Sequence, residues 1–100
     1  MAHEIKLLLS ATAELKGFRV FEQRQIADAI EQNLRHEPTV PARNRKCLRD
    51  FVPNFEHEPP VWELRVGEFR VFYDVDTVAE VVYVRAVRQK VHGQTTEEIA

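Results

Sequence analysis

Two arginines face each other in the most regularly patterned stretch of the sequence, Val61 to Asp76, which reads VWELRVGEFRVFYDVD. Apolar and polar residues alternate on both sides of Gly67, a pattern typical of two strands joined by a tight turn. With Gly67 and Glu68 at the centre of that turn, Arg65 lies directly opposite Arg70. Arginine is the side chain best suited to binding a phosphate through two parallel hydrogen bonds. An anion such as phosphate is therefore one possible occupant of the space between the two arginines.

The opposed arginines need a compensating negative charge. Like charges directly across a pair of strands are destabilising, because their Cβ atoms lie roughly 4.5–5.5 Å apart. A bound phosphate is one source of that charge. Glu63 and Asp74 on the neighbouring surface are another, and they would make the arginines part of a structural ion-pair network, whose exposed members contribute little to stability. The sequence leaves both interpretations open.

A second group of cations lies upstream, in the segment ARNRKCLRDF at residues 42–51. It belongs to a longer stretch, 38–60, which contains all five prolines of the chain and is predicted to be mostly loop. One interpretation is a solvated loop that Leu48 and Phe51 anchor to the core, and the other is a phosphate-contacting loop. The candidate phosphate ligands of this loop are Arg43, Arg45, Lys46 and Arg49.

A β-hairpin is predicted to position the opposed arginines. Gly67 occupies the first central position of its turn, where a type II′ turn requires a positive φ. The predicted pairs are Val66 with Phe69, Arg65 with Arg70, Leu64 with Val71, Glu63 with Phe72 and Trp62 with Tyr73. The face expected to pack on the core carries Trp62, Leu64, Val66, Phe69, Val71 and Tyr73. The opposite face carries Glu63, Arg65, Arg70 and Phe72.

Two helices are predicted to cover the apolar face of this hairpin. The apolar run Glu4 to Leu9 is predicted to be a first strand. A short helix then passes through Ala13, Glu14 and Leu15, with Ser10 or Thr12 as its N-cap, and ends at Gly17.

The clearest helix spans Phe21 to His36 and ends before Pro38, because its apolar residues recur at spacings of three and four. Its apolar stripe, extended backward along the chain, consists of Leu15, Phe18, Phe21, Ile26, Ala29, Ile30, Asn33 and Leu34.

After the hairpin, a second turn spans Val75 to Glu80 and a strand is predicted at Val81 to Arg88. The favoured phase of that strand places Val82, Val84 and Ala86 on the core and leaves Tyr83 and Arg85 on the face of the opposed arginines. The tail, Gln89 to Ala100, is expected to be short and partly mobile.

The composition bounds the class of protein. One hundred residues with 44% hydrophobic content predict one globular domain, residues 1–100. No run of about 18 apolar residues occurs, and the start MAHEIKLLLS lacks a basic leader with a cleavage site, so we expect a cytoplasmic protein without a membrane span. The net charge of −2 argues mildly against a nucleic-acid binder, although clustered arginines can still form a basic groove.

Several common kinds of active site find no support in the sequence. Cys47 is the only cysteine, and we interpret it as an ordinary, partly buried residue, because no orienting partner for a nucleophile is recognisable nearby. His3, His36 and His57 are scattered without ligand spacing, so no metal site and no cofactor are expected. No glycine-rich phosphate loop, HExxH or GxSxG pattern occurs, which argues against a conventional hydrolase or nucleotide site.

From about Glu4 to Lys90 the chain resembles the toxins of type II toxin–antitoxin modules, the RelE/ParE superfamily. The most specific part of the resemblance is LRVGEFRVFYDVD with the downstream VVYV strand, and TVPARNRKCL looks like the basic loop of one subgroup. The resemblance implies an α+β fold, with two N-terminal helices packed on a mostly antiparallel sheet of about four strands.

The resemblance also implies alternative functions. RelE-like members are ribosome-dependent endoribonucleases that cut mRNA and so inhibit translation, whereas ParE-like members act on DNA gyrase. A third possibility is an attenuated member that only binds its partner. In each case the implied partner is a cognate antitoxin of the Phd/YefM or RelB type, held in a hydrophobic groove beside the helices, and RelE-like action would add the ribosome and mRNA.

Several residues match the positions of the RelE-like site. The resemblance assigns contact with the scissile phosphate to Arg70, with Arg65 and Lys90 as further cations, and His92 is the one titratable side chain near the end that could move a proton. His92 could equally be a solvated tail residue. On the arginine face, Phe72, Tyr83 and Arg85 could contact RNA, the two aromatic rings by stacking on bases, or the rings could be covered by the antitoxin or the tail. Two positions depart from the family pattern, because Val61 and Glu63 stand where other members place lysines.

Overall fold

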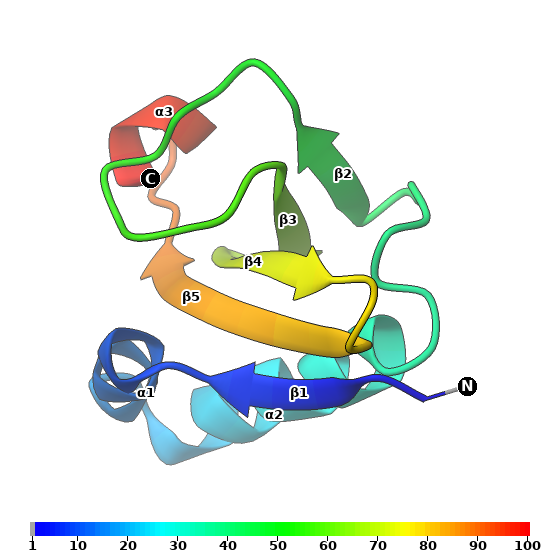
Figure 1. The fold of residues 1–100 in the computed structure, drawn as a ribbon. Coiled ribbons are helices and arrows are strands. Elements are labelled where there is room, and N and C mark those ends of the chain that lie inside the picture. Colours follow the sequence, from blue (N-terminus) through cyan, green and yellow to red (C-terminus); the bar gives the residue numbers. More distant parts are fainter. Residues whose placement is uncertain (1) are drawn as a thin grey trace.

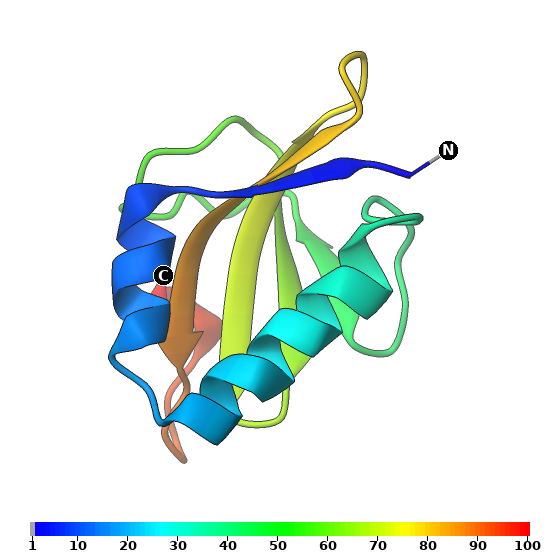
Figure 2. The same cartoon turned by 90° about the horizontal axis from the view of Figure 1, so that it is seen from below.

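The computed structural model describes residues 2–100 and has a five-stranded sheet between two unequal layers (Figure 1). The elements in chain order are β1 (Glu4–Leu7), α1 (Leu9–Lys16), α2 (Val20–Leu34), β2 (Arg45–Leu48), β3 (Val61–Val66), β4 (Phe69–Asp76), β5 (Val81–Gln89) and α3 (Thr96–Ile99). The strand order is β1-β5-β4-β3-β2, and only the β1–β5 pair is parallel. Helices α1 and α2 cover one face, while α3 and the β2–β3 loop lie over the other (Figures 1 and 2). The predicted α+β fold is confirmed, with one strand more than expected.

The β3–β4 hairpin has the predicted register, from Trp62 opposite Tyr73 to Val66 opposite Phe69. Gly67 has φ = 58°, a conformation that glycine adopts without steric cost, and this allows the tight turn. The alternation therefore places one set of side chains toward α1 and α2 and the other set toward the outer face, as the sequence predicts.

The main core lies between the sheet and the two N-terminal helices. From α2 it takes Ile26, Ile30 and Leu34, which recur every four residues and are at most 4% exposed. Leu15 and Phe18 pack against this core, but Phe21 does not. Its side chain is 62% exposed, so the prediction that Phe21 belongs to the buried stripe is wrong. The periodic pattern predicted the helix correctly, but it extended the helix two residues too far at its C-terminal end and the buried face too far at its N-terminal end.

A second, smaller core lies on the outer face of the sheet. Its buried members are Val61, Phe72, Ala86, Ile99 and Ala100, with Leu48, Phe51 and Phe55 packed against them. The tail was expected to be partly mobile, but α3 docks here and the Ile99 carbonyl accepts a hydrogen bond from Arg88 Nη1 at 2.6 Å. The backbone amide of Asn54 also donates to the Ala100 carbonyl at 3.0 Å. Segments 51–55 and 96–100 therefore close over the outer face together.

An irregularity between β4 and β5 changes the predicted phase of the last strand. The register shifts between Phe72 and Tyr73, so that Tyr73 pairs with Val84 but Phe72 pairs with Ala86. Ala86 therefore joins the outer core, contrary to the prediction, and Val87 takes the place facing the helices. An extra residue in one strand of a pair reverses the faces of all that follow it.

Helix α1 begins earlier than predicted, and two of its side chains form hydrogen bonds with the backbone of β5. Its N-cap is Leu8, not Ser10 or Thr12. Ser10 instead donates its hydroxyl to the Arg85 carbonyl at 3.1 Å, and Glu14 accepts a hydrogen bond from the Val87 amide at 3.1 Å. Where β1 ends at Leu7, these side chains satisfy backbone groups of β5 that would otherwise lack a partner.

Strand β2 lies within the stretch that was predicted to be mostly loop. Arg45–Leu48 pairs antiparallel with Leu64 to Val61 of β3. Four residues between prolines carry too weak a local pattern to predict a strand, and the pairing with β3 supplies the hydrogen bonds. Within residues 2–100, no helix is long and apolar enough to cross a membrane.

Candidate anion-binding site

Three arginines form a row across the outer face of the sheet. Arg65 of β3 pairs with Arg70 of β4, as predicted, and Arg70 also pairs with Arg88 of β5. The sequence reasoning missed Arg88, because the favoured phase of the last strand put this position on the core face. A charged residue at a supposed core position was the signal that could have revealed the error.

Two carboxylates partly neutralise this row. Glu63 is only 5% exposed, and its carboxylate lies 3.9 Å from Arg70 Nε and 3.6 Å from Lys46 Nζ. Thr96 of α3 donates its hydroxyl to the same carboxylate at 2.9 Å. Arg88 forms an ion pair with Glu14 of α1. An ion-pair network of the predicted kind is therefore present, with Glu63 and not Asp74 as the partner of Arg70.

Arg70 is held rigidly beside the hairpin turn. Its side chain is 8% exposed, and Nη1 donates to the carbonyls of Gly67 at 2.8 Å and Phe69 at 2.9 Å. Burial lowers the pKa of Arg70, an effect that Glu63 opposes and Arg65 reinforces. A guanidinium that is removed from water and positioned in advance binds an anion with little loss of side-chain freedom.

The surroundings of the row carry more positive than negative charge. Arg43, Lys46 and Arg65 are exposed, and together with Glu63 they line a small hollow of about 30 Å³. With Arg70, Arg88 and Lys90 there are six cations at this end of the sheet. They stand against Glu63 and Glu14 and the exposed carboxylates of Glu68, Glu97 and Glu98. A small excess of positive charge therefore remains, which favours an anion here.

Other residues proposed from the sequence have structural roles. Arg45 is 9% exposed, and its guanidinium donates to the carbonyls of Val40 at 2.7 Å and Asn33 at 2.8 Å. It braces the chain after α2, and it also belongs to the lining of the small hollow beside the row. Phe72 is fully buried beneath Phe55, with ring centroids 5.7 Å apart, so its ring is not available for base stacking in this structure.

Lys90 and His92 follow β5 at the same end of the sheet. The Lys90 amide donates to the Glu68 carbonyl of the hairpin turn at 2.7 Å, which keeps Lys90 near the row. His92 is exposed, in a turn closed by the Gln94 amide bonding to the Val91 carbonyl at 3.0 Å. Arg49, just past the end of β2, is exposed as well. The structure therefore ties the Lys90 backbone to the hairpin turn and leaves His92 in an exposed turn.

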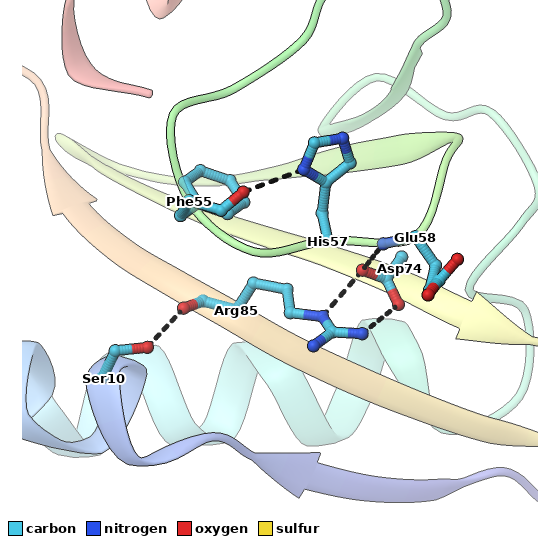
Figure 3. A network of polar contacts seen from close by, with 6 residues as sticks. All are labelled: Ser10, Phe55, His57, Glu58, Asp74 and Arg85. Carbon is cyan, nitrogen blue, oxygen red and sulfur yellow. Dashed lines mark hydrogen bonds and ion pairs between the residues drawn. The ribbon is translucent and has the colours of Figure 1, made fainter.

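Tyr83 and Arg85 lie at the opposite end of the same face. The Arg85 guanidinium donates to both carboxylate oxygens of Asp74, from Nε at 2.8 Å and from Nη2 at 3.2 Å (Figure 3). It also stacks on the Tyr83 ring, 5.2 Å from the centroid. The two residues are on the predicted face, but the structure does not bring them to the arginine row. Among residues 2–100, no group of three or more histidine, cysteine, aspartate or glutamate side chains is arranged to hold a metal ion.

Comparison with known proteins agrees with this architecture. The solved RelBE2 toxin–antitoxin complex of Mycobacterium tuberculosis matches with a TM-score of 0.70 and 18% sequence identity, covering 90% of this chain and 100% of that one. The archaeal RelE–RelB complex of Pyrococcus horikoshii OT3 matches with a TM-score of 0.72 and 18% identity, covering 93% of this chain and 100% of that one. At this identity the likeness shows the fold. No curated protein matches the chain.

The family is shown by the sequence itself. Residues 5–91 match the model of the ParE toxin of the type II toxin–antitoxin system parDE. The match covers both N-terminal helices and all five strands except the first residue of β1. The chain therefore belongs to the ParE toxin family and is a toxin of a type II toxin–antitoxin module.

Proposed function

We propose that this toxin binds RNA phosphate at the arginine row and inhibits translation as a RelE-like, ribosome-dependent endoribonuclease. The observation that carries the proposal is the row Arg65–Arg70–Arg88, with an excess of cations around it. Phosphate binding is compatible with the observed ion pairs, because Glu63 and Glu14 neutralise only part of the positive charge of the arginine row.

RNA cleavage of this kind needs charge stabilisation and proton transfer. The 2′-hydroxyl oxygen attacks the adjacent phosphorus, the bond from phosphorus to the 5′ oxygen breaks, and the products are a 2′,3′-cyclic phosphate and a 5′-hydroxyl. Arg70 and Arg65 would meet the charge that develops on the phosphate oxygens, with Lys90 and Arg88 beside them. Such side-chain cations require no metal ion or cofactor. His92 remains the proposed group that moves a proton, and Arg43, Lys46 and Arg49 the proposed contacts to flanking phosphates.

The arginine row is tested by removing its charge while retaining side-chain bulk. We expect Arg65→Gln with Arg70→Gln to abolish growth arrest on expression and to weaken RNA binding by about a hundredfold, since each charged hydrogen bond contributes about 1.5–3 kcal/mol. The matched control is Lys16→Gln with Arg24→Gln, two exposed positions on α1 and α2 with the same change of net charge. Circular dichroism and thermal unfolding must show that both variants fold. Equal growth arrest by the double variant and wild type would overturn this site.

A gyrase-directed toxin is the second candidate, and the match to a ParE toxin model favours it. Such a toxin would act as a binding module without chemistry of its own. Pulse labelling after induction separates the two candidates, because a nuclease stops protein synthesis first and a gyrase poison stops DNA replication first. Absence of growth arrest with a folded wild-type protein would instead indicate an attenuated family member.

We also infer a cognate antitoxin of the Phd/YefM or RelB type as partner. The two similar solved structures are complexes of a toxin with its antitoxin. In this chain the helix layer leaves apolar side chains in solvent, with Leu9 90%, Val20 64% and Phe21 62% exposed. Exposed apolar side chains of this size are suited to an amphipathic segment of a partner. Co-purification with the product of the adjacent gene tests the inference.

A further inference from the structure

A cavity of about 490 Å³ lies on the outer face, at the end of the sheet away from the arginine row. It is lined by Glu58, Asp74, Val75, Asp76, Tyr83 and Arg85. Phe55 and Phe72 stand between the two ends, with ring centroids 5.7 Å apart. The proposed RNA chemistry uses none of these lining residues as a reacting group, so the cavity calls for a separate explanation.

The wall of this cavity already holds one guanidinium. Arg85 is bound through two hydrogen bonds to Asp74 (Figure 3), whose side chain is 2% exposed. The same guanidinium stacks on the ring of Tyr83. The Glu58 backbone amide donates to the same Asp74 carboxylate at 3.0 Å and fixes it further. A carboxylate beside an aromatic face is the combination that favours a planar cation, and the protein builds that combination here for its own side chain.

The remaining lining groups leave room and charge for a second cation. Asp76 uses Oδ1 to accept the amides of Val78 and Ala79, at 3.1 and 2.9 Å, which holds its carboxylate at the rim. Glu58 donates its backbone amide to Asp74 and also lines the cavity. Asp74 is matched by Arg85, so Glu58 and Asp76 give the cavity a net negative charge.

Negative charge surrounds Arg85 in the wall of the cavity. The pKa of Arg85 is raised, first by its hydrogen bond to Asp74, and further by the charges of Glu56 and Glu58. A field that stabilises one guanidinium repels phosphate, which makes RNA a poor occupant at this end. The outer face thus has a cationic end and an acidic end, which select ligands of opposite charge.

We propose that the cavity receives an arginine side chain of a partner protein, with its guanidinium between the carboxylates of Glu58 and Asp76 and beside the Tyr83 ring. That the partner is the antitoxin rests on the proposed function. The preference of the cavity for a guanidinium does not, because it follows from the lining residues alone. A basic segment bound here would cross the outer face close to the β2–β3 loop, on the side opposite the exposed apolar residues of the helices.

The probe that tests this is N-acetyl-arginine methylamide, titrated into ¹⁵N-labelled protein at low salt. We expect chemical-shift changes centred on Glu58, Asp76 and Tyr83, and an affinity about tenfold weaker in Glu58→Gln with Asp76→Asn, because two exposed ion pairs are lost. The matched control, Asp28→Asn with Glu37→Gln, removes the same charge from exposed positions on α2 and just beyond it and should bind like wild type. The corresponding lysine amide should bind more weakly, since it lacks the planar fork.

Three results would overturn the inference: shift changes centred on other residues, equal binding by the Glu58/Asp76 variant, or uridine monophosphate occupying this cavity in preference to the arginine amide. The last result would identify an RNA subsite. The variant leaves the arginine row intact, so growth arrest without antitoxin should persist in it. Failure of probe binding with growth arrest retained therefore counts against this cavity alone, and failure of the Arg65/Arg70 test counts against the RNA site alone.

Discussion

Several buried polar groups of the sheet have a specific partner, and the partners differ between its two faces. On the outer face Arg70 faces Glu63, and Arg85 is bound to Asp74. On the helix face the Tyr73 hydroxyl, fully buried, donates to the Pro38 carbonyl at 2.5 Å. Removing one member of such a pair leaves the other without solvent or partner, which costs more than the pair contributes as a whole.

Tyr73→Phe tests this at one residue. We expect the free energy of unfolding to fall by about 1–3 kcal/mol at neutral pH, because the buried Pro38 carbonyl loses its donor. Burial also raises the pKa of the Tyr73 hydroxyl well above its usual value, with Cys47 adding to the effect and Arg45 opposing it. Denaturant unfolding measured from pH 7 to 11 checks both statements.

The sign of the pH effect follows from the raised pKa. The pKa of tyrosine in the unfolded chain is about 10. Below that pH the stabilisation from Tyr73 is fully present. Above it the unfolded chain loses the proton while the folded chain retains it, so the stability difference between wild type and Tyr73→Phe should shrink. Tyr83→Phe on the outer face is the control for tyrosine ionisation in general. A difference that stays constant up to pH 11 would contradict the raised pKa.

At the scale of elements, α3 shows how a segment too short to form a helix alone becomes ordered. Four residues cannot offset the cost of helix nucleation in water. Docking supplies what local propensity lacks: Ile99 is 7% exposed in the outer core, and Thr96 bonds to Glu63. Thr95 and Glu98 form a capping box that satisfies the first turn. Through Glu63 the helix is also tied to the arginine row.

Ile99→Asp should therefore undock α3. A carboxylate cannot be buried beside Val61 and Phe72 without a partner, so we expect a loss of about 2–3 kcal/mol in unfolding free energy. Amide hydrogen exchange should speed up by at least about tenfold in residues 95–100 and in 51–55, and by more there than in α1 and α2, whose slowest amides report only the loss in global stability. Val78→Asp, at a side chain 95% exposed, is the control. Unchanged protection of 95–100 would show that α3 does not depend on Ile99.

At the scale of the whole molecule, the two layers present different surfaces. The helix layer exposes apolar side chains, whereas the outer layer carries a cationic end and an acidic end on either side of a small apolar core. A partner that binds both layers would contact apolar side chains on the helix layer and charges of both signs on the outer layer. This division favours a long, wrapping antitoxin segment over a compact partner.

Phe21→Ser tests the apolar contribution to that complex. Because Phe21 is 62% exposed, we expect the thermal stability of the free toxin to change little, within about 0.5 kcal/mol. The affinity for the product of the adjacent gene should fall by about tenfold to a hundredfold if the ring is buried in the complex. Val91→Ser removes a similarly exposed apolar side chain, 60% exposed, from the segment after β5 and serves as control. Equal loss of affinity in both variants would argue against a binding surface on the helices.

Local patterns in the sequence determined the hairpin and the long helix. Gly67 with alternating neighbours specified the turn, the register and the opposition of Arg65 to Arg70, because side-chain direction in a strand has a period of two. Spacings of three and four specified α2 and its buried side chains Ile26, Ile30 and Leu34. The family resemblance added the α+β arrangement. These features depend on residues close to one another in the chain.

Only the tertiary structure decided what covers the outer face. The strand β2, the docked helix α3 and the register shift that brings Arg88 beside Arg70 depend on partners far away in the sequence. Elements of four residues carry too little periodicity to be predicted locally, and one extra residue in a strand reverses every later side chain. The hydrogen bonds of the buried Arg45 guanidinium to the carbonyls of Val40 and Asn33 likewise depend on the folded chain and not on a local pattern. The sequence by itself thus determined that arginines oppose one another, and long-range packing decided which of them can meet an anion.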